Sequence, residues 1–410
     1  MTAPRTLPKG FPAYGRTAQT QYPALEVLRG MVQEQEGDAR RADLPSPSAA
    51  PDSGPPRITV LIPAHNEAAT IAQTIRSLRQ QSIPVASITV VCDNCTDDTA
   101  QIAEALGVHV MVTTGNTARK AGALNQALER VLPTLNWDDL VLTMDADSAL
   151  SQRWLELASR TLRLDPMVGA VCGAFLGEPG AGIIGQLQRN EYFRYARIIQ
   201  RRWQALVLSG TGTLFRVPVL RQVARERGLS LPGTTGQWYS HASITEDDEM
   251  TLAVKALGWK CLTVAQCETT TEVMPTVGAL WTQRMRWQKG TLGDLHAYGL
   301  TKMTLSYWLR QVGLYGGFAV SYACLFILIG AVIVFPQFSV AWTGGVLSIS
   351  VIERTWTVRR AGWRGMLLAA LIVPEGIYSL WQGWLFFAAA VASLQRREIA
   401  WGHLAREATA

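Results

Sequence analysis

Short apolar runs alternate with amphipathic stretches between residues 57 and 147. Each run is rich in β-branched residues and ends at a polar turn, a pattern typical of buried parallel strands. The stretches between the runs carry apolar residues at helical spacing, for example Ile71, Ile75 and Leu78. This alternation predicts an α/β fold with an open, mostly parallel sheet. The predicted strands are 58–63, 87–92, 108–112 and 140–144, and the predicted helices are 69–81, 97–106, 121–131 and 250–257.

A second pattern begins after Gln311, where the chain becomes strongly apolar. Residues 312–335 carry no charge and are long enough to cross a bilayer of about 30 Å. Residues 338–352 are shorter, and residues 365–394 are interrupted near Pro374. The last run fits either one tilted helix or two half-helices that turn back at the proline. We therefore expect about three membrane segments in a transmembrane region, 301–410.

The arginines around these segments predict an orientation. Positively charged loops favour the cytoplasmic side. With the α/β domain inside the cell, a re-entrant third segment places both groups of arginines inside as well. We therefore expect a multi-pass protein of the cell membrane with a cytoplasmic catalytic domain. The flanking arginines are Arg354, Arg359, Arg360, Arg364, Arg396 and Arg397.

The segment 1–56 differs from both regions. It holds nine of the 19 prolines among polar residues, a composition that predicts disorder. Its first 30 residues contain no apolar core of the length that a signal peptide needs. We expect three parts: a disordered segment, a catalytic domain at 57–300 and the transmembrane region.

Composition and charge argue against a nucleic-acid-binding protein and against a zinc protein. The chain is 48% apolar and 17% charged, with a formal net charge of +6. Its basic residues form no long run, so nucleic acid is not an expected partner. Cys92 and Cys95 form a C-x-x-C pair without the second pair that a zinc site requires. Reduced thiols are the expected state, and a redox dithiol is the alternative.

Acidic and basic residues gather where the predicted strands end. Asp145 and Asp147 stand at i and i+2, so both carboxylates can hold Mg²⁺ or Mn²⁺; a solvated turn is the alternative. Asp93 ends the second strand and suits a base N–H or a ribose hydroxyl, whereas Asp97 or Thr96 would cap the next helix. Lys120 either meets phosphates or is a solvated surface lysine.

Two later segments also carry candidate chemistry. Residues 245–249 are an acidic run before a helix, which either interacts with the helix dipole or supplies a general base. In Gln283-Arg284-Met285-Arg286-Trp287, helical spacing places Gln283, Arg286 and Trp287 on one face. That face suits a diphosphate and a sugar ring, or alternatively anchors the chain at the membrane surface.

Together these segments resemble the family 2 glycosyltransferases over residues 57–300. Within the family they are similar to the membrane-integrated polysaccharide synthases, such as the cellulose, chitin, hyaluronan and poly-N-acetylglucosamine synthases. The matching blocks are I-P-A-H-N-E (62–67), V-V-C-D-N-C-T-D-D-T (90–99), M-D-A-D-S (144–148), T-E-D (245–247) and Q-R-M-R-W (283–287). The resemblance implies a GT-A-like nucleotide-sugar domain.

The resemblance also implies roles for single residues. Asp247 would be the catalytic base, and Asp145 and Asp147 would hold the metal. The nucleotide-sugar donor would contact Pro63, Glu67, Asp93, Lys120, Asp145, Gln283, Arg286 and Trp287. The acceptor would contact Gly210, Thr211, Gly212, Glu246 and Trp287. Residues 191–202 would form an amphipathic helix at the membrane surface.

The activity implied is an inverting, metal-dependent transfer of a hexose or N-acetylhexosamine. The sugar would pass from a UDP-sugar to the growing end of a polysaccharide at the membrane. We expect no membrane helix before the catalytic domain, which leaves room for a homo-oligomer or a partner membrane subunit. One alternative is transfer of a single sugar to a lipid carrier or glycolipid, and another is a domain that only senses nucleotide sugars.

Overall fold

The computed structural model describes residues 56–334 and 336–395, with side chains for all of them except 200–202 and 336–343. The predicted disordered segment, apart from Pro56, and the basic pair Arg396 and Arg397 lie outside the described residues. The described part of the chain belongs to one compact unit, 52–410.

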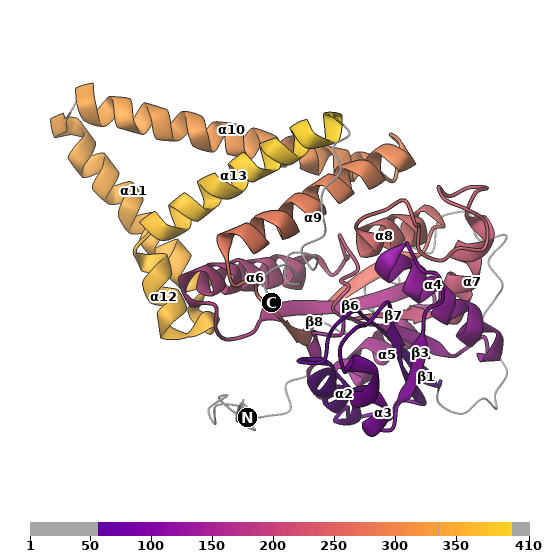
Figure 1. Ribbon diagram of the computed structural model, residues 1–410. Helices are drawn as coiled ribbons and strands as arrows, with labels where there is room; N and C mark the ends of the chain where they lie inside the picture. The colour runs from indigo at the N-terminus through magenta and orange to yellow at the C-terminus, as the bar shows by residue number, and fades with distance from the viewer. Residues whose placement is uncertain (1–55, 335, 396–410) are drawn as a thin grey trace. The chain divides into compact units, whose positions relative to one another are not determined.

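The first half of the sheet follows the predicted alternation. Strands β1, β2, β3 and β4 are mutually parallel, with β1 between β2 and β4. Helices α2, α3 and α4 follow the first three strands in turn (Figure 1). The elements are β1 (Ile58–Ala64), α2 (Ile71–Arg79), β2 (Ser87–Cys92), α3 (Thr99–Ala105), β3 (His109–Val112), α4 (Arg119–Val131), the short η1 (Leu132–Thr134) and β4 (Leu140–Thr143).

The second half makes the sheet mixed. The eight strands run in the order β3-β2-β1-β4-β7-β6-β8-β5. Strand β7 pairs antiparallel with both β4 and β6, β6 pairs parallel with β8, and β5 pairs antiparallel with β8. The predicted α/β fold is confirmed, and the antiparallel pairings are an addition to it. These elements are β5 (Ala149–Leu150), α5 (Trp154–Leu164), β6 (Val168–Gly177), β7 (Thr213–Arg216), α7 (Val217–Glu226) and β8 (Lys260–Thr271).

The main core lies between this sheet and the helices on it. Apolar side chains of β1, β4 and β7 share one buried cluster with α4, where Leu124 and Leu128 are 1% and 0% exposed. Strand residues such as Leu61, Val141 and Phe215 belong to the same cluster. The strands are therefore apolar along most of their length, and their polar residues are concentrated where the strands end.

Three further helices complete the region before the apolar tail. They are α6 (Gly182–Arg202), α8 (Glu246–Ala256) and α9 (Val277–Tyr298). Helix α8 begins within the acidic run, so its first turn contains four carboxylates. Helix α9 contains the Gln283–Trp287 segment.

The C-terminal part is helical. It contains α10 (Leu305–Val334), α11 (Pro336–Thr357), the short η2 (Arg359–Ala361), α12 (Gly362–Ala370) and α13 (Val373–Leu394). In the described part of the chain, two of these helices, α10 and α13, are long and apolar enough to cross a membrane. The predicted segment 365–394 is divided at Leu371 and Ile372, and Pro374 lies in the first turn of α13, where its missing N–H is tolerated.

Buried polar contacts attach this helical part to α6 and α9. Glu375 is 2% exposed and accepts hydrogen bonds from Asn190 (2.8 Å), Arg194 (2.7 Å) and Arg354 (3.0 Å). A small apolar cluster that includes Leu187, Leu280 and Tyr378 lies beside these contacts. Helices α6, α11 and α13 are thus joined around the buried carboxylate of Glu375, and α9 joins them through the apolar cluster.

Candidate active site

The residues that end β2 form one side of the site. Asp93 is 7% exposed, and its Oδ1 accepts hydrogen bonds from Thr113 (2.8 Å), Asn116 (2.7 Å) and Asn94 (3.1 Å). These three donors all bind Oδ1, so they fix the direction in which Oδ2 points. His65 Nδ1 lies 2.6 Å from the Asp93 carbonyl oxygen. The carboxylate is therefore held in one position by its neighbours.

The neighbouring acidic residues of this loop have a structural role. Asp97 accepts hydrogen bonds from the backbone N–H groups of Ala68 (2.9 Å) and Thr99 (3.1 Å). These bonds tie the loop after β1 to the loop after β2. Glu67 lies in the first of these loops, where its carboxylate accepts from Thr70 (2.9 Å), and Pro63 is buried within β1.

Lys120 is the central residue of the second side of the site. It lies in the first turn of α4, and its Nζ contacts Asp145 Oδ1 at 2.6 Å and Glu246 Oε1 at 2.8 Å. Burial disfavours its charge, but Asp145, Glu246 and Asp247 outweigh that effect and raise the pKa of Lys120 well above its usual value. Lys120 is therefore a fixed positive charge that joins the end of β4 to the start of α8.

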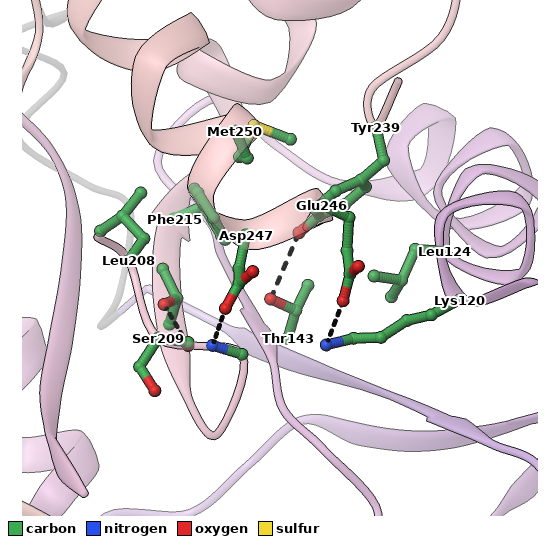
Figure 2. Close-up of a pocket in the computed structure, with 12 residues that line it drawn as sticks. Lys120, Leu124, Thr143, Leu208, Ser209, Phe215, Tyr239, Glu246, Asp247 and Met250 are labelled. Atoms are coloured by element: carbon green, nitrogen blue, oxygen red, sulfur yellow. Dashed lines mark hydrogen bonds and ion pairs between the residues drawn. The ribbon is translucent and has the colours of Figure 1, made fainter. Parts of the chain in front are cut away.

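The backbone at Gly210 completes this cluster. Its N–H donates to Asp247 Oδ2 at 3.1 Å, and its carbonyl accepts from the Asp145 N–H at 3.0 Å. A Cβ at this position would lie 2.8 Å from Lys120 Nζ and 3.1 Å from Asp145 Oδ2. A small cavity opens here, lined by Lys120, Gly210 and Asp247 together with Thr143 and other residues (Figure 2).

The four carboxylates that begin α8 have four different environments. Glu246 contacts Lys120, whereas Asp247 faces Gly210 at the cavity. Asp248 accepts a hydrogen bond from Thr291 of α9 (2.6 Å), and Glu249 pairs with buried Arg227.

Glu246 and Asp247 both line the cavity, but the pKa of Glu246 is lowered, against burial and by Lys120 first, whereas that of Asp247 is raised. Burial first, and then the charge of Glu246, raise the pKa of Asp247. Lys120 partly opposes that shift. Asp247 is thus the carboxylate of this run best suited to accept a proton.

The second carboxylate of the D-x-D segment lies among other acids. Burial, followed by the charges of Asp145 and Glu67, raises the pKa of Asp147 to about 7. Ser148 donates to its Oδ1 at 3.1 Å. Oxygen ligands crowded in this way fit a hard divalent cation, which would relieve their repulsion. In the described residues no group of three or more His, Cys, Asp and Glu side chains is arranged for a metal, so further ligands would have to come from substrate and water.

The Gln283–Trp287 segment contains an arginine whose role the sequence did not reveal. Arg284 is 6% exposed, pairs with Glu191 at 3.1 Å and lies 4.4 Å over the Trp287 ring. Arg286 is half-buried and close enough to Glu246 to lower the pKa of that carboxyl, against burial and together with Lys120. The segment therefore has one arginine in the core of the helical part and one facing the acidic cluster.

The structure thus brings most of the predicted residues together. Lys120, Asp145, Gly210, Glu246 and Asp247 are linked by direct contacts. The charges of Asp145 and Glu67 act on Asp147, and that of Arg286 acts on Glu246. Asp93 lies at the end of β2, which is separated by β1 from β4, the strand that leads to Asp145.

The remaining predicted residues lie at the margins or have other contacts. Thr211 and Ser209 share a hydrogen bond between their hydroxyls (2.7 Å). Gly212 faces the core, because a Cβ there would meet Leu150 and Trp154. The Gln283 side-chain oxygen is buried without a hydrogen-bond partner. No sequence signal marked the ion pair of Arg284 and Glu191, whose members are 93 residues apart.

The comparisons with known proteins assign the class. Residues 55–290, more than half of the chain, match the family described as glycosyltransferase like family 2. The fold is that of a GT-A-like glycosyltransferase, and the chain belongs to glycosyltransferase family 2. The predicted family, fold class and enzyme class are confirmed at this level.

Individual relatives are more specific. The chain is 28% identical over 243 residues to the poly-beta-1,6-N-acetyl-D-glucosamine synthase of Staphylococcus aureus (strain COL), covering 57% of this chain and 54% of that protein. It is 26% identical over 246 residues to the enzyme of the same name from Staphylococcus epidermidis, with the same coverage. The chain therefore matches about half the length of these curated relatives.

One solved structure shares the fold over most of the chain. It is the mannosyltransferase PcManGT from Pyrobaculum calidifontis, in complex with GDP-Man and Mn²⁺. The TM-score is 0.55 at 19% identity, covering 92% of this chain and 95% of that one. This likeness concerns the fold alone.

Proposed function

We propose that the chain transfers a hexose or N-acetylhexosamine, with inversion, from a UDP-sugar to the growing end of a polysaccharide at the membrane. The observation that carries this proposal is the contact of Asp247, Gly210, Lys120 and Asp145 at one cavity. The poly-N-acetylglucosamine synthases among the relatives support the choice of sugar and product.

Asp247 is the proposed base. A raised pKa makes its carboxylate a stronger proton acceptor, and a base works best when its pKa lies near the working pH. The Gly210 N–H binds Asp247 Oδ2 at 3.1 Å and the Asp248 N–H binds Oδ1 at 3.0 Å, which fixes the carboxylate beside the cavity; a remaining lone pair would accept the proton of an acceptor hydroxyl. That hydroxyl loses its proton to Asp247 as its oxygen attacks the anomeric carbon, so a single displacement inverts the configuration.

The donor's diphosphate is proposed to bind near Lys120 and Arg286. Both are positively charged and face the acidic cluster, so they would stabilise the charge of the departing diphosphate. Asp145 and Asp147 would hold Mg²⁺ or Mn²⁺, which when bound neutralises part of the same charge. Lys120 contacts Asp145 and Glu246 in this structure, and we expect it to turn towards phosphate when the donor binds.

The nucleoside is proposed to bind beside Asp93. Its Oδ2 would accept a base N–H or a ribose hydroxyl, since the recorded hydrogen bonds all use Oδ1. Pro63 and Glu67, in β1 and the loop after it, would line this part of the pocket.

The acceptor is proposed to approach along α9. Trp287 offers an aromatic face, and Gln283 and Thr211 offer polar groups near the same approach. Gly210, Gly212 and Glu246 would shape the floor of this path. The partly exposed indole would stack on a sugar ring of the product.

The membrane assignment rests on α10 and α13. Many apolar side chains of α10 are exposed, among them Phe326, Ile327 and Ile333 at more than 70%, which suits contact with lipid. We propose a multi-pass protein of the cell membrane with its catalytic domain in the cytoplasm, working as a homo-oligomer or with a partner membrane subunit.

The experiment compares Asp247→Asn with Asp248→Asn in the full chain. Nucleoside diphosphate release from a panel of nucleotide sugars, with Mg²⁺ or Mn²⁺, measures turnover, and UDP binding measures the donor site. We expect D247N to lose transfer but keep UDP binding. D248N should keep transfer and UDP binding, because the Asp248 side chain accepts a hydrogen bond from Thr291 and does not line the cavity. Normal transfer by D247N would exclude Asp247 as the base, and the product's anomeric configuration tests inversion.

The alternative is transfer of one sugar to a lipid carrier or glycolipid. It is favoured by the small number of long apolar helices, two in the described part of the chain. Product length separates the two activities: a labelled donor yields high polymer in the first case and one or two added sugars in the second.

A further inference from the structure

Two cysteines bracket Asp93 at the donor site. Cys92 is the last residue of β2 and is 2% exposed, whereas Cys95 is half-buried. The Ala64 carbonyl oxygen accepts a hydrogen bond from the Asp93 N–H at 2.8 Å and another from the Cys95 thiol at 3.3 Å. Ala64 is also the residue that pairs with Cys92 across β1 and β2. Both cysteines therefore lie close together at the carboxyl end of β2, on either side of Asp93.

The two thiols differ in acidity. The hydrogen bond from Cys92 lowers the pKa of Cys95 to about 6, and the backbone N–H of Asn66 acts in the same direction against the effect of burial. The same thiol–thiol bond, followed by burial, raises the pKa of Cys92. An accessible thiolate beside a buried thiol is the arrangement that thiol–disulfide exchange requires.

A metal is a weaker explanation of the pair. Within the described residues, no third His, Cys, Asp or Glu joins the two cysteines in a metal-binding group. Zinc sites held by proteins need at least three such ligands. The observations therefore favour redox chemistry at this C-x-x-C segment.

Closing the pair would disturb the donor site. A disulfide needs the sulfurs about 2.05 Å apart, well inside the contact distance of two separate thiols. The chain between them is short and already tightly turned, since Asn94 has a φ of 51°. Drawing Cys95 towards Cys92 must therefore move Asp93 and Asn94. That movement would strain the bonds from Thr113 and Asn116 to the Asp93 carboxylate.

We propose that Cys92 and Cys95 form a redox-active dithiol that closes to a disulfide and weakens nucleotide binding at Asp93. This inference rests on the proposed donor site. The oxidant is a low-molecular-weight disulfide. The Cys95 thiolate attacks one of its sulfurs and releases a thiolate; deprotonated Cys92 then attacks the Cys95 sulfur and releases the second. Two protein thiols are oxidised, and one disulfide is reduced to two thiols.

The experiment treats the full chain in detergent with oxidised glutathione or with dithiothreitol. Intact mass and peptide mapping measure the disulfide, and titration with UDP and Mn²⁺ measures the donor site. We expect a Cys92–Cys95 disulfide and UDP affinity weakened about tenfold, the effect of losing one hydrogen bond to a charged group. Dithiothreitol should reverse both changes.

Two variants serve as controls. Cys95→Ser should bind UDP like the reduced chain and be insensitive to oxidised glutathione. Cys324→Ser removes the exposed cysteine of α10 and should respond like the unchanged chain.

A chain that binds UDP but forms no Cys92–Cys95 disulfide would overturn the redox inference alone, as would a disulfide that leaves UDP affinity unchanged. A reduced chain that binds no nucleoside diphosphate would overturn the donor site, and redox control of binding with it.

Discussion

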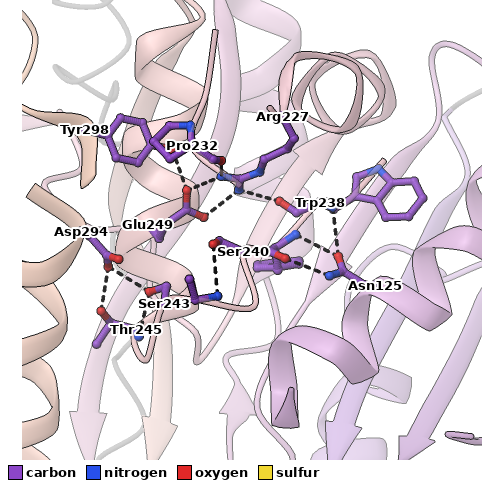
Figure 3. A network of polar contacts seen from close by, with 12 residues as sticks. Asn125, Arg227, Pro232, Trp238, Ser240, Ser243, Thr245, Glu249, Asp294 and Tyr298 are labelled. Carbon is purple, nitrogen blue, oxygen red and sulfur yellow. Dashed lines mark hydrogen bonds and ion pairs between the residues drawn. The ribbon is translucent and has the colours of Figure 1, made fainter. Parts of the chain in front are cut away.

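The position of α8, which carries Asp247, depends on one buried ion pair. Arg227 is 0% exposed and Glu249 is 3% exposed. The guanidinium binds both carboxylate oxygens and donates to the carbonyls of Pro232 (3.0 Å) and Trp238 (2.8 Å) (Figure 3). Tyr298 of α9 donates to the same carboxylate at 2.6 Å. Arg227 therefore connects the end of α7, the following loop, α8 and α9.

Arg227→Met keeps most of the side-chain volume but leaves Glu249 buried with Tyr298 as its remaining donor. Breaking a buried pair in this way costs about 3–5 kcal/mol. Protonating the carboxyl instead costs about 3.7 kcal/mol at pH 7, from a reference pKa near 4.3, so about 3–4 kcal/mol is the expected loss. Each kcal/mol lowers Tm by about 2–4 °C in a domain of this size, which predicts a fall of about 6–16 °C.

Thermal unfolding of the full chain in detergent measures this fall. Arg225→Met is the matched control, because Arg225 lies two residues earlier, is 72% exposed and pairs with Glu226 at the surface; such pairs contribute about 0–1 kcal/mol. The double variant R227M/E249Q should unfold at a higher temperature than R227M, since no charge is then left unpaired. Equal Tm values for R227M and R225M would refute the reasoning, and so would additive losses in the double variant.

Further predictions concern the site and its surroundings. Lys120→Met should weaken UDP binding about 10- to 100-fold in titration calorimetry, because the partly buried cation proposed to bind phosphate is lost. Gly210→Ala should lower kcat/KM by about 10- to 100-fold at nearly unchanged Tm, since its Cβ would displace Lys120 and Asp145. Chelation of divalent ions should stop nucleoside diphosphate release, and added Mn²⁺ or Mg²⁺ should restore it. Burial, followed by the charge of Asp248, raises the pKa of Asp294 to about 8. The folded chain therefore binds more protons than the unfolded chain from about pH 4 to 8, and its stability should fall as pH rises through this window. Asp294→Asn should flatten that slope when unfolding is measured as a function of pH.

The sequence predicted the first half of the fold well. Strands β1, β2, β3 and β4 appear within a residue or two of the apolar runs, because a parallel strand covered on both faces must be apolar throughout. The polar clusters at Asp93 and Asp145 lie at strand ends for the same reason. Strand β7 was not predicted: its four residues acquire their place between β4 and β6 from pairings with distant segments, which no local pattern encodes.

The site residues divide in the same way, into those that a local pattern predicts and those whose place depends on distant segments. Helical spacing put Gln283, Arg286 and Trp287 on one face, but it did not distinguish the role of Arg284, which pairs with Glu191 in another helix. The acidic run was recognisable, yet the separate tasks of its carboxylates depend on Lys120, Thr291 and Arg227, all distant in sequence. Motif residues were therefore predictable, and the residues that hold them in place were not.

The buried contacts between α6, α9 and α13 have a practical consequence for producing the enzyme. A soluble fragment ending near residue 300 would lose Tyr378 and Gln382, whose side chains donate to Glu191 at 2.7 Å and 3.0 Å. It would also lose Glu375, the acceptor for Arg194. Such a fragment exposes the apolar side of α9 and unpaired charges on α6, so it is expected to aggregate. The apolar tail is a structural part of the catalytic unit, and biochemical work should begin from detergent or nanodisc preparations that retain it.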